Sequence, residues 1–223
     1  MRPLCELLLP GERVVALVGG GGKTSLMYAL GRQLAGRGAR VLVTTTTRIK
    51  APARNLFLLG SRPDAPPYTL LTVGTAVEPD SGKLVGVEPG DIPELMERFR
   101  ADLVLVEADG AKGRPLKAPL AHEPVIPACA DLVIGVLGLD ALGQVVDGGT
   151  VFRMEAFCAV TGLVPGDVIG PDAYRALAEH PQGIFKGCPA SARRVAFHNK
   201  ADIGGALGRV YGSAQLGWFV SLE

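Results

Sequence analysis

The chain has few aromatic residues, almost no net charge and no long apolar run. Only 5% of its 223 residues are aromatic, so stacking platforms for single-stranded nucleic acid are not expected. The 23 Lys and Arg residues nearly balance the 22 Asp and Glu residues, leaving a formal charge of +1. Such a chain has no overall attraction to nucleic acid or to an anionic membrane, and neither is predicted as a partner.

Membrane and secretion signals are also missing from the sequence pattern. A membrane-spanning helix needs about 20 predominantly apolar residues, whereas the longest uncharged stretches, 65–77 and 210–222, contain turn-forming or polar residues. No apolar segment long enough for a signal peptide precedes Glu12. The four cysteines form no C-x-x-C pair, which favours reduced thiols over disulfides or structural zinc. These features together predict a cytoplasmic protein.

What the sequence does contain is apolar strands alternating with helices. Hydrophobic residues make up 48% of the chain, and 30 glycines and 17 prolines divide it into short elements. Strands are predicted at 14–18, 40–43, 102–106, 132–137, 194–197 and 218–222, and helices at 23–35, 91–100, 153–161, 172–180 and 203–211. The alternation predicts one P-loop NTPase-like α/β domain over 1–223, with a mostly parallel sheet flanked by helices.

A different pattern runs from about 50 to 90. Short β-like pieces follow one another between proline-rich loops, and Pro79-Asp80-Ser81-Gly82 is a turn signature between two alternating stretches. We expect an antiparallel hairpin insertion around 68–88.

The strongest motif is a glycine loop between the first strand and the first helix. Gly19, Gly20, Gly21 and Gly22 are followed by Lys23, Thr24 and Ser25. Glycines let backbone amides approach phosphate oxygens, and a helix N-terminus adds donors. Lys23 would neutralise the phosphates of GTP or ATP, and the Thr24 hydroxyl would ligate Mg²⁺. The loop departs from G-x-x-x-x-G-K-[ST], because Leu17 occupies the first glycine position.

Two more motifs follow predicted strands. The strand 102–106 delivers Glu107 and Asp109 to a sheet edge, where Glu107 could hold Mg²⁺ or its waters and Asp109 could share that role or position water. Asn199-Lys200-Ala201-Asp202 matches N-K-x-D, in which Asp202 could accept hydrogen bonds from guanine that adenine does not offer. We therefore expect Lys23, Glu107 and Asp109 to be catalytic, Asn199, Lys200 and Asp202 to bind the nucleotide, and GTP to be preferred over ATP.

A second group of polar residues also falls after predicted strands. Thr46 and Arg48 follow the second strand and could meet phosphate charge. The loop after the acidic strand carries three cations that could bind an anionic second substrate, and two further polar residues lie in later loops. The candidate substrate-binding residues are Thr46, Arg48, Lys112, Arg114, Lys117, His122 and Asp140.

Taken together, these motifs resemble the YqeC family. The resemblance rests on residues 19–24, 44–47, 106–119, 122–127, 138–143 and 199–202, and so extends over nearly the whole chain. The resemblance implies an accessory role for selenium-dependent molybdenum hydroxylases and a link to selenium cofactor biosynthesis. It also implies a hydroxylase or a selenium-donor protein as partner.

The sequence thus predicts Mg²⁺-dependent binding and hydrolysis of a nucleotide by an accessory protein of molybdenum hydroxylase maturation. Two alternatives remain open. One is a kinase or ligase that uses the nucleotide to activate a small anionic substrate. The other is a non-hydrolysing chaperone that binds a partner hydroxylase or a cofactor.

Overall fold

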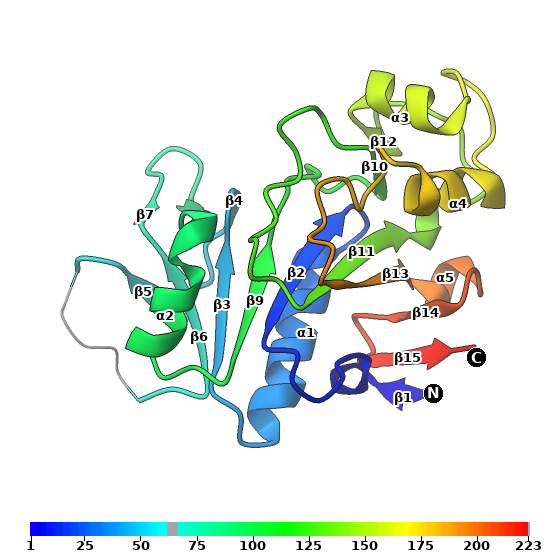
Figure 1. The fold of residues 1–223 in the computed structure, drawn as a ribbon. Helices are drawn as coiled ribbons and strands as arrows, with labels where there is room; N and C mark the ends of the chain where they lie inside the picture. Colours follow the sequence, from blue (N-terminus) through cyan, green and yellow to red (C-terminus); the bar gives the residue numbers. More distant parts are fainter. Residues whose placement is uncertain (62–66, 223) are drawn as a thin grey trace.

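A ten-stranded sheet forms the centre of the protein in the computed structural model, which describes residues 1–61 and 67–222 (Figure 1). The strand order is β1-β15-β14-β13-β11-β2-β9-β3-β6-β5. Every neighbouring pair from β14 to β5 is parallel, whereas β15 is antiparallel to both β14 and β1. The strands are β1 (Arg2–Pro3), β2 (Val14–Gly19), β3 (Val41–Thr45), β5 (Leu56–Leu58), β6 (Leu70–Gly74), β9 (Leu103–Glu107), β11 (Leu132–Gly138), β13 (Arg193–Asn199), β14 (Val210–Ser213) and β15 (Trp218–Ser221). The predicted α/β class with a mostly parallel sheet is confirmed.

Helices cover both faces of this sheet. They are α1 (Lys23–Gly36), α2 (Ile92–Arg98), α3 (Met154–Thr161), α4 (Pro171–Glu179), α5 (Ala201–Gly204) and the short 3₁₀ turns η1 (Leu4–Leu7), η2 (Pro89–Asp91) and η3 (Leu139–Ala141). None of the helices in the described ranges is long and apolar enough to cross a membrane.

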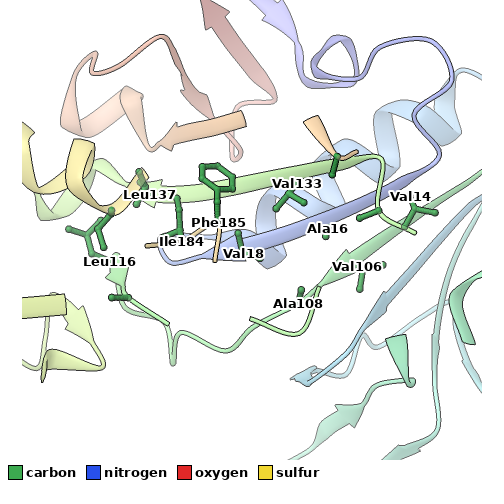
Figure 2. Close-up of a cluster of buried hydrophobic side chains, with 14 of the residues drawn as sticks. Val14, Ala16, Val18, Val106, Ala108, Leu116, Val133, Leu137, Ile184 and Phe185 are labelled. Atoms are coloured by element: carbon green, nitrogen blue, oxygen red, sulfur yellow. The ribbon is translucent and has the colours of Figure 1, made fainter. Parts of the chain in front are cut away.

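Successive side chains of the central strands point to opposite faces of the sheet, so the core is divided into two layers. On β2, Ala16 and Val18 join one cluster with residues of α2, α3 and α4, and part of that cluster is drawn in Figure 2. Val15 and Leu17 join the other cluster, with residues of α1 and η1. A strand buried on both faces needs a continuous apolar run, which is why these strands could be recognised from sequence.

Two small sheets lie outside the main one. Strands β4 (Arg48–Lys50), β8 (Lys83–Val85) and β7 (Ala76–Val77) form an antiparallel sheet, and β10 (Leu116–Lys117) pairs with β12 (Val151–Phe152). The expected hairpin around 68–88 is therefore smaller than predicted: β7 and β8 form it, but Leu70–Gly74 is β6, a parallel strand beside β3. Leu71 and Val73 are buried, as residues of an interior strand are.

The predicted helix over 203–211 is wrong. Only the single turn α5 forms, and β14 follows in place of further helix. Gly205 and Gly208 adopt φ of +83° and +72°, a left-handed conformation that ends a right-handed helix. β14 therefore adds a parallel strand next to β13.

Candidate functional site

The glycine loop lies where β2 ends and α1 begins, packed tightly against the neighbouring strand and loop. Gly21 has φ +66°, and a Cβ built on it would lie 2.2 Å from the Gly138 nitrogen. The amides of Gly20 and Gly21 donate to the carbonyls of Val136 and Arg114. The loop can follow this path only with glycine at its crowded positions.

These bonds leave a defined set of donors at the start of α1. The Gly19 amide donates to Asp109 Oδ2 at 3.1 Å, so the amides of Gly19 to Gly21 all have acceptors within the protein. Within the described part of the chain, the amides from Gly22 to Ser25 donate no hydrogen bond. Any anion cradled here would therefore be bound by the helix N-terminus rather than by the first glycines.

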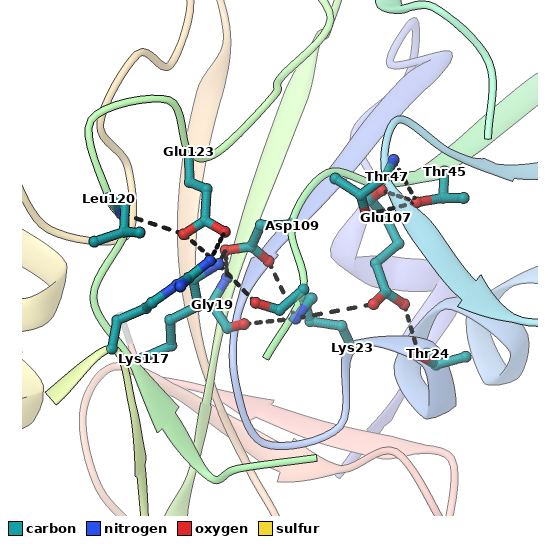
Figure 3. Close-up of polar contacts among 12 residues, drawn as sticks. Gly19, Lys23, Thr24, Thr45, Thr47, Glu107, Asp109, Lys117, Leu120 and Glu123 are labelled. Atoms are coloured by element: carbon teal, nitrogen blue, oxygen red, sulfur yellow. Dashed lines mark hydrogen bonds and ion pairs between the residues drawn. The ribbon is translucent and has the colours of Figure 1, made fainter. Parts of the chain in front are cut away.

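Lys23 is held by oxygens of the loop and the acidic strand end. Its Nζ donates to the Gly19 carbonyl at 2.6 Å and lies 3.1 Å from Asp109 Oδ1 and 3.9 Å from Glu107 Oε1. Figure 3 shows these contacts converging on the ammonium group of Lys23, a residue that is 4% exposed. The predicted catalytic residues Lys23, Glu107 and Asp109 are thus brought together.

Glu107 also meets Thr24. The Thr24 hydroxyl donates to Glu107 Oε2 at 2.6 Å, and the Thr45 hydroxyl donates to the Glu107 backbone carbonyl at 2.7 Å (Figure 3). Burial raises the pKa of the Glu107 carboxyl above its ordinary value, and the nearby Lys23 charge and the Thr24 bond only partly oppose this. A cation placed beside Glu107 would favour its ionised form.

Behind Asp109 lies a second buried lysine. Lys117 Nζ is 3.2 Å from Asp109 Oδ2 and 3.0 Å from Glu123 Oε2, and it donates to the Gly110 carbonyl at 2.6 Å. The sequence placed Lys117 among the substrate-binding cations of a loop, but its side chain is fully buried in β10. From this position it contacts carboxylates of the protein itself.

The chain of charges ends at Arg153. Its Nη2 donates to Glu123 Oε1 at 3.2 Å. Burial alone would raise the pKa of Glu123, but the hydrogen bond and charge of Lys117, with help from Arg153, hold that pKa below its ordinary value. The side chains therefore form one continuous row of alternating charge: Lys23, Asp109, Lys117, Glu123 and Arg153.

A cleft of about 720 Å³ opens over the glycine loop. Its walls come from the start of α1, the segment 46–50, β8, the loop 110–114 and residues 152–153. Its charged lining residues are Lys23, Arg48, Lys50, Lys83, Lys112, Arg114 and Arg153, against Glu107 and Glu123. Seven cations minus two acids give +5 in one cleft, in a chain whose total is only +1. The cleft is therefore suited to a polyanion.

The predicted substrate-binding residues divide into two groups. Thr46, Arg48, Lys112 and Arg114 line the cleft; Thr46 donates to the Val125 carbonyl, and Arg48 pairs with Glu78 at 2.5 Å. His122 is exposed and does not line it, and Asp140 pairs with Lys200 at 2.5 Å on the other side of β2.

The N-K-x-D residues lie at the end of β13, also on that other side. Asn199 is buried: its amide nitrogen donates to the Gly21 carbonyl at 2.7 Å, and its Oδ1 accepts from the Ala214 amide at 2.9 Å. Asp202 is exposed on α5. Asn199 therefore ties the glycine loop to the turn after β14, while Asp202 remains accessible.

Comparison with known proteins gives the family. The family described as "YqeC protein" matches residues 15–155. The chain belongs to the YqeC family. It is also 40% identical over 193 residues to the protein named "Uncharacterized protein YqeC" of Escherichia coli (strain K12), an alignment covering 84% of this chain and 75% of that protein.

The part matched by the YqeC family contains most of the cleft. The glycine loop, Glu107, Glu123 and Arg153 fall within 15–155, whereas Asn199 to Asp202 lie beyond it. In this YqeC-family chain, the sequence motifs did not identify Lys50, Lys83, Phe152 and Arg153 as cleft residues. They come from separate short elements, and no spacing pattern links them to the loop.

Proposed function

We propose that the protein binds a Mg²⁺-nucleotide complex at the glycine loop, prefers GTP to ATP, and hydrolyses it. The observation that carries this proposal is the convergence of Lys23, Thr24 and Glu107 beside the donors of the α1 N-terminus. A lysine, free helix-terminal amides and a hydroxyl paired with a carboxylate are the groups that phosphoryl chemistry requires.

The residues present fit a magnesium ion. The Thr24 hydroxyl and the Glu107 carboxylate supply adjacent oxygens, and Mg²⁺ takes oxygen ligands, usually one or two carboxylates completed by phosphate and water. Within the described ranges no group of three or more His, Cys, Asp or Glu side chains could hold a metal alone, which suits an ion bound together with phosphate. When bound, Mg²⁺ would neutralise charge on the phosphoryl group being transferred.

Asp109 is our candidate for orienting water. Its buried Oδ1 pairs with Lys23 but accepts no well-aligned hydrogen bond, whereas its Oδ2 is held by Lys117 and the Gly19 amide. If Lys23 turns towards a phosphate, Oδ1 becomes available to accept a proton from water. Lys117 would hold the carboxylate in place during this change.

The preference for GTP rests on Asp202 and the turn after β14. Asn199 joins that turn to the glycine loop, and a pocket of about 480 Å³ lies between α1 and the turn, lined by Thr24, Ser25, Tyr28, Arg32, Ala214 and Gln215. A base reaching this side would lie near the N-K-x-D segment. Guanine offers paired donors to a carboxylate, and adenine does not.

The biological setting follows from the family resemblance. We propose an accessory role in the maturation of selenium-dependent molybdenum hydroxylases, with a hydroxylase or a selenium-donor protein as partner. A strain lacking the gene should make hydroxylase protein that lacks activity, and the Lys23→Ala variant should fail to restore it. Full hydroxylase activity in the deleted strain would contradict this role.

A kinase or ligase remains the second candidate, because the cleft extends well beyond the loop and carries excess positive charge. Product analysis separates the two. With Mg²⁺ and GTP alone, the hydrolase should release GDP and inorganic phosphate, and Lys23→Ala should not, while the exposed Arg37→Gln variant should match the parent. GTP turnover that requires an added small anionic substrate, and that yields a phosphorylated or nucleotidylated form of this substrate, would favour the kinase or ligase. No turnover by any route would contradict hydrolysis.

A further inference from the structure

We propose that the basic cleft holds a second anion site, separate from the nucleotide, which binds a small phosphate-bearing molecule. The inference deepens the proposed function and rests on it, because the nucleotide is taken to occupy the glycine loop. The site is formed by β4, β8 and the loop 110–114, and its central pair is Lys50 and Lys83.

The pairing of β4 with β8 places two like charges opposite each other. Lys50 and Lys83 are Cα partners in this antiparallel pair, and both side chains are exposed and line the cleft. Ile49 and Leu84, the next partners, are buried. Directly opposed like charges destabilise a strand pair. An anion held between them would turn this repulsion into attraction.

The cleft cations are also short of acidic partners. Arg48 pairs with Glu78 and Arg153 with Glu123, but across residues 1–61 and 67–222 Lys50, Lys83, Lys112 and Arg114 form no ion pair. Lys112 lies 5.5 Å from the Phe152 ring centroid, which holds it at the cleft wall. Four unpaired cations from three elements around one cavity suit a ligand with several anionic oxygens, as phosphate groups provide.

The sheet topology separates the position of this second anion site from that of the nucleotide base. Thr24 and Ser25 line both the basic cleft and the smaller pocket beside β14, so phosphates at the start of α1 would lie where the two meet. Asn199 ends β13 and Asp202 follows that strand, on the β11 side of β2, whereas β4 follows β3, on the β9 side. A nucleotide whose base turns towards Asp202 leaves the Lys50–Lys83 side for a second ligand.

The test measures inorganic pyrophosphate binding to protein already saturated with Mg²⁺ and a non-hydrolysable GTP analogue, by isothermal titration calorimetry. We expect one pyrophosphate to bind. The Lys50→Gln/Lys83→Gln variant should bind it at least about tenfold more weakly, since each charge-assisted bond contributes appreciably, with unchanged affinity for the analogue. The matched control, Arg37→Gln/Arg209→Gln, removes the same charge from exposed positions outside the cleft and should behave as the parent.

Two results would overturn the second site. One is failure of the saturated protein to bind pyrophosphate, and the other is equal affinity in the parent and in Lys50→Gln/Lys83→Gln. If the analogue itself does not bind, the nucleotide proposal fails, and titration of Lys23→Ala then decides the second site alone. Pyrophosphate binding by Lys23→Ala that is lost on adding Lys50→Gln/Lys83→Gln supports it, and binding that is unchanged or absent refutes it.

Discussion

Lys117 Nζ lies 3.2 Å from Asp109 Oδ2, and both side chains are buried behind the glycine loop. Lys117 also binds Glu123, so one lysine compensates two carboxylates. This pairing fixes Asp109 in the position from which it contacts Lys23. The cleft therefore depends on a residue that does not line it.

Replacing Lys117 by methionine should be strongly destabilising. The change keeps most of the side-chain volume but removes the charge shared by buried Asp109 and partly buried Glu123, which keep Lys23 and Arg153 as their cationic partners. Breaking a buried pair in this way costs about 3–5 kcal/mol. Urea denaturation would measure the loss. Arg175→Gln is the control, because its pair with Asp172 is exposed and should contribute little. Parent-like stability of Lys117→Met would contradict the role of this lysine.

Glu107→Gln should change how stability depends on pH. The pKa of Glu107 is raised in the folded protein, so its contribution to stability is fully present below the unfolded-state value of 4.5 and is lost as pH rises through the raised pKa. The glutamine cannot ionise, yet its carbonyl can still accept the Thr24 hydrogen bond. The variant should therefore gain stability relative to the parent as pH rises above 4.5.

The same comparison can be followed by thermal denaturation without ligand, from about pH 4 to about pH 8. The difference in Tm between Glu107→Gln and the parent should increase over this window and then level off. A difference that is constant with pH would show that the pKa of Glu107 is not raised in the folded protein.

Gly21→Ala should disrupt the loop. The new Cβ would lie 2.2 Å from the Gly138 nitrogen, at a φ of +66° that other residues rarely adopt, so we expect a loss of about 2 kcal/mol or more. Gly36→Ala is the matched control: it lies at the end of α1 with nothing within 4 Å of the added Cβ. Chemical denaturation should separate the two variants, and equal stability would contradict the tight packing described.

The central strands and the glycine loop could be predicted because their signals are local. Continuous apolar runs such as 14–18 identify strands buried on both faces, and the loop before Lys23 has its own spacing. β14 could not be predicted, because a four-residue strand after several glycines gains its pairing only from its neighbours in the sheet, β13 and β15. Nor could the burial of Lys117, since its partners Asp109 and Glu123 are brought to it by packing.

Variants of Asn199 and Asp202 should separate support of the loop from recognition of the base. Asn199→Ala removes the bonds to the Gly21 carbonyl and the Ala214 amide, so affinity for GTP and ATP should fall together. Asp202→Asn alters an exposed side chain and should reduce GTP affinity with little effect on ATP. Competition binding with both nucleotides would measure this. Equal losses of GTP affinity and ATP affinity in Asp202→Asn would contradict recognition of the guanine base by Asp202.

The central claim is tested most directly by titrating Mg²⁺-GTP into the parent protein and into Lys23→Ala in a calorimeter, with Arg37→Gln as the control. Of the two substituted residues, Lys23 contacts the glycine loop and the acidic end of β9, whereas Arg37 does not. The account predicts one saturable site in the parent and in Arg37→Gln, and at least about a tenfold loss of affinity in Lys23→Ala. No binding by the parent, or equal binding by Lys23→Ala, would contradict it.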